Sequence, residues 1–219
     1  MSCVKKDSGL VYRMKQIDTY INERLKINKD SVRSYRYKPK TKEELHHLLV
    51  QLMSSRGKDA DLNDIDTSEI TNMEDLFFTL DPHNIDVSKW NMSNVTDVYN
   101  MFRGCKNFNC DLSEWDVSNV DDFGCMFRGC GKFNCDLSKW NVSNASSFFN
   151  MFANCKNFNS DLSEWKTDNL VRCEGMFFGC KKFDCDLSVW DMAGHGIDMR
   201  DMFRGCESLK KMPDWYKES

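Results

Sequence analysis

The sequence predicts an α/β solenoid, in which short coils of chain stack on one another behind a helical cap. Two observations predict it. All 6 tryptophans recur at a constant interval of 25 residues, and columns of phenylalanine, leucine and aspartate keep the same interval. Such an interval is typical of repeat proteins, because one repeat cannot bury its apolar face without a neighbour. The tryptophans are Trp90, Trp115, Trp140, Trp165, Trp190 and Trp215.

Each coil divides into two parts. Residues 108–113 alternate apolar and small polar side chains, which predicts a short strand with Phe108, Cys110 and Leu112 facing inward. Residues 93–104 place apolar side chains at helical spacing behind Ser, Asn and Thr cap candidates, which predicts about two helical turns ending at Gly104. The predicted coil is therefore a strand, a turn and a short helix, and stacked coils form a parallel sheet.

Two regions are predicted. Residues 1–57 form a cap of two helices and a short strand, with one helix over residues 11–27 and a second opened by the capping box at residues 41–44 and closed by Gly57. Residues 58–219 form a solenoid of about six repeats with an atypical last coil. Residues 1–60 hold 14 Lys and Arg against 7 Asp and Glu, whereas the remainder holds 16 against 27, so the cap is basic and the solenoid acidic.

The sequence also predicts the cellular compartment of the protein. The first residues are not followed by an export signal, and no apolar run approaches the length of a membrane span, so we expect a cytoplasmic protein without membrane contact. The 11 cysteines are then expected to be reduced thiols.

The repeated columns have structural explanations beside chemical ones. We expect the tryptophans to form a packing ladder, with a stacking platform for sugars or bases as the alternative. We expect the cysteines at 105, 130, 155 and 180 and at 110, 135 and 185 to be core residues, with disulfides or metal as alternatives. The aspartates at 61, 86, 111, 136, 161 and 186 are expected to cap turn N–H groups, with calcium as the alternative. No metal or cofactor is therefore predicted.

Catalysis finds no support in the sequence. The 4 histidines, His46, His47, His83 and His195, stand at no spacing that pairs them with a nucleophile or a metal. The expectation is a protein that is not an enzyme and takes no small-molecule substrate.

A partner site is predicted where the repeat interrupts its outward-facing positions. Phe149, Ala153 and Phe178 fall together on adjacent coils, replacing the arginines found at these positions elsewhere in the stack. Exposed aromatic side chains are natural anchors for a protein partner. Tyr99 shares the column of Phe149, and the extra residue near His195 adds a small loop as a second candidate.

The consensus over residues 101–120, MFRGCKNFNCDLSEWDVSNV, resembles the BspA-like leucine-rich-repeat proteins, in the branch with the mycoplasma-lipoprotein-type 25-residue repeat. The likeness extends to residues 39–45 and 212–216. It implies a leucine-rich-repeat-like fold and a role in adhesion or partner binding without catalysis.

The primary hypothesis is a non-catalytic scaffold that binds another protein inside the cell. One alternative is an inhibitor from a phage or mobile element that blocks a host nucleic-acid-processing or defence enzyme. Another is a surface adhesin, as in exported members of the family. A third is nucleic-acid binding, restricted to residues 1–60 and carried by the basic and aromatic side chains there. Those side chains are Lys5, Lys6, Arg33, Tyr35, Arg36, Tyr37, Lys38 and Lys40.

Overall fold

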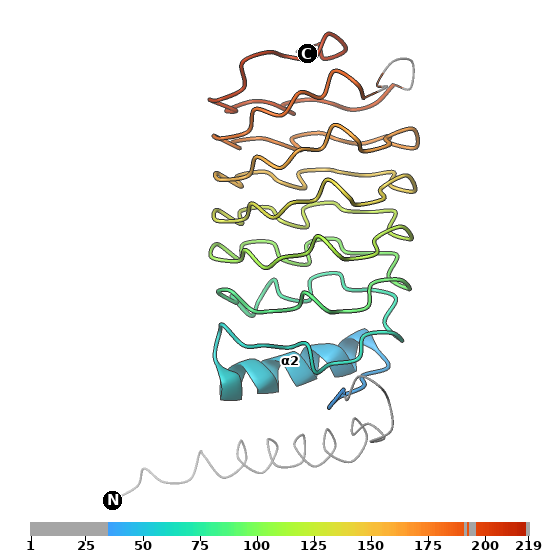
Figure 1. Cartoon of the computed structure of the whole chain (residues 1–219), viewed down its shortest axis with the longest axis vertical. Helices are drawn as coiled ribbons and strands as arrows, with labels where there is room; N and C mark the ends of the chain where they lie inside the picture. Colours follow the sequence, from blue (N-terminus) through green and yellow to red (C-terminus); the bar gives the residue numbers. More distant parts are fainter. Residues whose placement is uncertain (1–34, 191, 193–195, 218–219) are drawn as a thin grey trace, which may run out of the picture.

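The structure, a computed structural model, describes residues 35–190, 192 and 196–217. Figure 1 shows these residues as a stack of flattened coils, with a helix lying across the N-terminal end and the C-terminal segment at the other. That helix, α2, spans Lys42–Arg56 and is the one α-helix of the described residues. The predicted helix over residues 11–27 lies outside them, as do Lys5, Lys6 and Arg33.

Helix α2 begins and ends where the sequence predicts. The Thr41 hydroxyl accepts the Glu44 N–H at 3.2 Å, and the Glu44 carboxylate accepts the Lys40 N–H at 2.9 Å, so two donors at the helix start are satisfied. Gly57 follows the helix in the left-handed region with φ 89°. One face of the helix is buried through four leucines and a methionine, which cover the first coil: Leu45, Leu48, Leu49, Leu52 and Met53.

Successive coils are joined by parallel β-bridges between equivalent positions. The longest series links Asn72, Asp97, Asp122, Ser147, Arg172 and Asp198. Beyond each bridge, alternate backbone N–H groups donate to carbonyls of the next coil. Asn100 donates to Gly124 at 2.9 Å, and Phe102 donates to Met126 at 2.9 Å. Residues 97–104 and their equivalents therefore form a hydrogen-bonded ladder that runs the length of the stack. A further parallel bridge joins Tyr37, before α2, to Ile65 of the first coil.

This ladder corrects the predicted secondary structure of the coil. Residues 93–104 form successive turns, and the short helices predicted there are wrong. Asn100 and Gly104 have φ of 55° and 80°, a left-handed conformation that a right-handed helix excludes. Their N–H groups consequently point to the next coil rather than back along the chain. The wider assignment to a leucine-rich-repeat-like solenoid stays a prediction.

The predicted strand over residues 108–113 has the expected burial but not the expected pairing. Phe108 and Leu112 are fully buried and Asn109 is exposed, in agreement with the alternation. The backbone here is paired largely through side chains. The N–H of Leu112 donates to the Cys135 sulfur at 3.1 Å, and the Leu112 carbonyl accepts the Trp140 indole N–H at 2.9 Å. Side chains replace the backbone partners that a regular sheet would use.

The tryptophans form a packing ladder, as predicted. The rings of Trp140 and Trp165 lie 6.5 Å apart at 3° between planes, and the ladder continues to Trp190 at 6.4 Å. Each indole N–H donates to a carbonyl of the preceding coil. Trp90 through Trp190 are at most 4% exposed, so their faces offer no platform to sugars or bases. A parallel ladder of phenylalanines lies beside them, with Phe102 and Phe127 at 5.7 Å and 2°.

The thiols also connect coils, and the ten cysteines of the described residues are free. In one column the thiol is a donor, as where Cys130 donates to the Phe102 carbonyl at 3.0 Å. In the second column the sulfur accepts a backbone N–H. Ser160 replaces cysteine in that column and accepts the Leu137 N–H at 3.0 Å, so the position requires an acceptor rather than sulfur chemistry.

The aspartate column caps turns, as predicted. Asp111 Oδ1 accepts the N–H of Ser113 at 3.0 Å, and Asp136 and Asp161 accept the N–H groups two residues on at 2.9 Å. These backbone N–H bonds are the largest cause that holds the pKa of the three aspartates below the usual value. The attraction offsets the repulsion between like charges on adjacent coils.

The lowered pKa values predict a loss of stability in acid. Because the folded state holds these carboxylates ionised, their contribution is present above pH 3.8 and is lost as the pH falls below it. We expect the free energy of unfolding in urea to fall between pH 5 and pH 3. The triple variant D111N/D136N/D161N keeps an amide oxygen acceptor, as Asn91 does toward the Ser93 N–H. Its loss over this interval should be smaller, and an equal loss would contradict the role of the column.

Candidate functional site

The outward side chains of the hydrogen-bonded ladder form one continuous surface, which we call the ladder face. It consists of residues 72–78, 97–103, 122–128, 147–153, 172–178 and 198–204. Inward side chains of the same segments, such as Phe102 and Met126, are fully buried, and the column of Phe102 is phenylalanine in every coil. Outward positions differ in size and charge between coils, so this face distinguishes one part of the stack from another.

Phenylalanine and arginine pair on the ladder face. The Arg172 guanidinium lies 4.7 Å from the centre of the Phe149 ring, and Arg204 lies 5.9 Å from that of Phe178. In both pairs the arginine belongs to the next coil, and both phenylalanines are half-buried. Stacked arginine and aromatic side chains attract through the ring quadrupole, and both residue types are common among the side chains that dominate protein interfaces.

The other predicted partner-site residues differ in their placement. Tyr99 is half-buried, and its ring covers Gly124, where an added Cβ would lie 2.8 Å from Cδ2 of the tyrosine. Ala153 does not face solvent as expected, since it is only 1% exposed. His195 lies outside the described residues. The structure therefore places Tyr99, Phe149 and Phe178 on one face and leaves Ala153 out of its surface.

One aromatic residue of this face was not predicted from the sequence. Phe78 is 44% exposed, and the Arg103 guanidinium lies 5.1 Å from its ring centre, as in the other two pairs. Phe78 precedes Arg103 by the repeat interval, so extending that column by one coil would have found it. It lines a hollow of about 360 Å³ between the first coil and α2, together with His46 and His47.

Charge is concentrated at the C-terminal end of the ladder face. Arg200 bridges two carboxylates, with Nη2 2.6 Å from Asp198 Oδ2 and 3.4 Å from Glu174 Oε1. The bonds from Arg200 lower the pKa of Asp198 to about 2. The aromatic pairs are thus followed by a charged network that is largely neutralised within itself.

The basic residues before α2 contact the first coil. Lys38 Nζ lies 3.4 Å from both Asp66 and Glu69, and Lys40 lies 4.0 Å from Glu69. The Tyr37 ring packs against the core between the guanidinium groups of Arg36 and Arg56, at 5.6 and 5.9 Å.

The neighbouring Tyr35 lines a pocket that also contains three aspartates, Asp59, Asp61 and Asp64. Of the residues predicted to bind nucleic acid, Lys38 and Lys40 therefore pair with carboxylates of the first coil, and Tyr35 lies beside three more.

Within the described residues, no group of three or more His, Cys, Asp and Glu side chains is placed to hold a metal ion. No helix in the same part of the chain combines the length and the apolar character that crossing a membrane would require.

The fold and its outward face define a class of protein, a stack of 25-residue coils with a repeated apolar interior and a variable exterior. The family described as "Mycoplasma protein of unknown function, DUF285" matches residues 49–154 and again residues 124–216, which together exceed half of the chain. The chain therefore belongs to this family, in agreement with the mycoplasma-type repeat that the sequence resembles. No curated protein and no solved structure matches the chain.

Proposed function

We propose that the protein is a non-catalytic scaffold that binds another protein through the ladder face. The observation that carries the proposal is the recurrence of outward phenylalanines, each beside an arginine of the next coil, at Phe78, Phe149 and Phe178. Arginine and aromatic side chains supply much of the energy of protein interfaces because each buries a large area. A face of stacked coils also holds these side chains at fixed separations.

The proposed setting is the interior of a cell. Cys105, Cys130, Cys155 and Cys180 each donate a hydrogen bond to a buried backbone carbonyl, which requires the thiol form. Oxidation would remove these donors and leave the carbonyls unpaired inside the core. A reducing compartment keeps the column intact.

The double variant F149S/F178S tests the proposal. Each phenylalanine is half-buried, so the expected cost to folding is small, whereas truncation of two interface anchors should weaken binding by about 2 kcal/mol or more, equivalent to roughly 30-fold. The partner is first captured with the wild-type protein and identified by mass spectrometry. Its dissociation constant is then measured for wild type and variant.

The matched control is V189S, which removes an equally apolar side chain that is 70% exposed away from the ladder face. We expect V189S to bind as the wild type does. Unchanged binding of F149S/F178S, or equal weakening by V189S, would contradict the ladder face as the partner site.

A further inference from the structure

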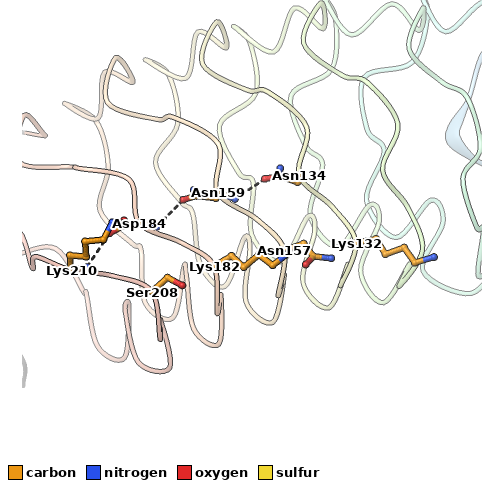
Figure 2. A pocket seen from close by; sticks show the side chains of 8 residues that line it. All are labelled: Lys132, Asn134, Asn157, Asn159, Lys182, Asp184, Ser208 and Lys210. Carbon is orange, nitrogen blue, oxygen red and sulfur yellow. Dashed lines mark hydrogen bonds and ion pairs between the residues drawn. The ribbon is translucent and has the colours of Figure 1, made fainter.

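A groove rich in hydrogen-bond donors runs beside the ladder face, on the turns that follow the first cysteine column. It has a volume of about 840 Å³ and extends over four coils. Figure 2 shows its lining side chains in two rows parallel to the stack. One row contains Lys132, Asn157, Lys182 and Ser208, and the other contains Asn134, Asn159, Asp184 and Lys210.

The second row fixes the orientation of its amides. Asn134 Oδ1 accepts the N–H of Asn159 at 2.7 Å, and Asn159 Oδ1 accepts the N–H of Asp184 at 2.7 Å. Because the side-chain oxygen must face the next coil, the amide nitrogen must face away from it. The Nδ2 groups of both asparagines have no acceptor in the described part of the chain. The row of asparagine amides thus presents a series of free donors to the groove.

The first row adds positive charge. Lys132 and Lys182 are exposed, and neither forms an ion pair with any described residue. The one carboxylate in the lining, Asp184, is already engaged: it accepts the backbone N–H of Lys210 at 3.0 Å and forms an ion pair with the ammonium group of the same residue. The groove therefore offers a ligand two unpaired ammonium groups and a row of amide donors, while its one carboxylate is already paired.

The surroundings restrict the shape of the ligand. The capping aspartates Asp136, Asp161 and Asp186 follow the amide row two residues along each coil and are exposed. A ligand must therefore be thin to contact the amide row without lying over these aspartates, whereas a nucleic acid duplex carries a second charged backbone that would lie near them. A single strand gains much of its affinity from stacking on aromatic side chains, and the lining contains none. A thin chain with anionic groups and hydroxyls satisfies both restrictions.

We propose that this groove binds a linear anionic polysaccharide, with lysines on its charged groups and asparagine amides on its oxygen atoms. Adjacent parallel chain segments lie about 4.8 Å apart, so the donors repeat along the stack as anionic groups repeat along such a polymer. The groove uses residues separate from Phe149 and Phe178. The test of polysaccharide binding is therefore independent of the test of the proposed protein-binding face.

The test measures binding of fluorescent heparin to the full chain by anisotropy at low and moderate salt. The variant K132E/K182E should weaken binding at least about tenfold, and moderate salt should weaken the wild type in the same direction, because exposed charges are screened. The control K139E/K166E makes the same change in net charge at exposed lysines outside the groove. We expect the control to lose less than about threefold, as for surface charges that do not touch the ligand.

A second variant, N134D/N159D, tests the amide row. Aspartate keeps the oxygen that accepts the N–H of the next coil, as Asp184 does toward Lys210. The hydrogen bonds between coils should therefore remain, while each amide Nδ2 donor is replaced by a carboxylate oxygen acceptor. We expect binding to weaken at least as much as in K132E/K182E. Equal losses in the groove and control variants, or no heparin binding at low salt, would overturn the proposal. Tighter binding of a single-stranded oligothymidylate that depends on the same residues would overturn the assignment to a polysaccharide.

Discussion

The protein should lose stability steeply above pH 9. Burial raises the pKa of Cys105 and Cys173 from 9.0 to about 12, and it raises the pKa of Cys130, Cys155 and Cys180 in the same direction. For a pKa that is raised in the folded state, the contribution to stability is complete below the unfolded value and disappears as the pH rises toward the folded value. Each of these thiols should cost about 1 kcal/mol at pH 10, on the order of 5 kcal/mol together.

Urea unfolding at pH 7 and pH 10 measures this loss. The double variant C130S/C155S replaces two thiols by hydroxyls, which still donate to the carbonyls of Phe102 and Phe127 but do not ionise in this range. The difference in unfolding free energy between the two pH values should shrink by about 2 kcal/mol. An unchanged difference would show that tyrosines or lysines, rather than the buried thiols, are responsible for the alkaline loss.

Truncation of a central tryptophan should be the most damaging single substitution. Trp140 is 3% exposed, stacks on Trp165, and donates its indole N–H to the Leu112 carbonyl at 2.9 Å. Removing a buried tryptophan side chain costs about 3–5 kcal/mol, and the orphaned carbonyl adds about 1 kcal/mol or more. We expect W140A to lower the free energy of unfolding by at least about 4 kcal/mol, measured in urea at pH 7.

The control is W215A at the last position of the same ladder. Trp215 is half-buried and has a tryptophan neighbour on one side only, at 6.5 Å, although its indole makes the same kind of bond to Leu187 at 2.9 Å. Its truncation should cost about 2 kcal/mol or less, because less area and less packing are lost. Equal costs for the two variants would mean that the ladder does not stack through the centre of the protein.

The interior of the coil could be predicted from the sequence because burial repeats at a fixed interval. The columns of Trp140, Phe127 and Leu112 identify core positions without any knowledge of the backbone, and the capping role of Asp136 follows from its residue type beside a turn. Helix α2 was also predictable, since its capping box and its glycine stop are local signals.

The conformation of residues 93–104 could not be predicted in this way. Apolar side chains at 95, 98, 101 and 102 fit a helix and a series of turns equally well, and the choice depends on the backbone. Asn100 adopts φ 55° because its N–H bonds to the next coil, a contact between residues 24 apart that a local pattern does not contain. Gly104 was correctly predicted to be left-handed, although it ends a turn rather than a helix.

The candidate sites could likewise be predicted only in part from the sequence. Phe149 and Phe178 stood out because they interrupt a column, whereas the pairing of each with an arginine of the next coil requires three-dimensional neighbours. The donor groove was hidden because Asn134 and Asn159 look uniform in the sequence. Their chemical asymmetry arises only when the oxygen of each amide is taken by the following coil.

Hydrogen exchange and nuclear Overhauser effects at the six indole N–H groups test the stacking of the coils most directly. In the folded stack the indoles of Trp90 through Trp190 are buried and donate to a carbonyl 28 residues earlier in the chain, as at 2.9 Å in Trp165 and Trp190. We predict slow exchange for these five, faster exchange for Trp215, and Overhauser contacts between Trp140 and Trp165 and between Trp165 and Trp190. Indole protons that exchange at the rate of free tryptophan, without contacts between rings 25 residues apart, would contradict the account.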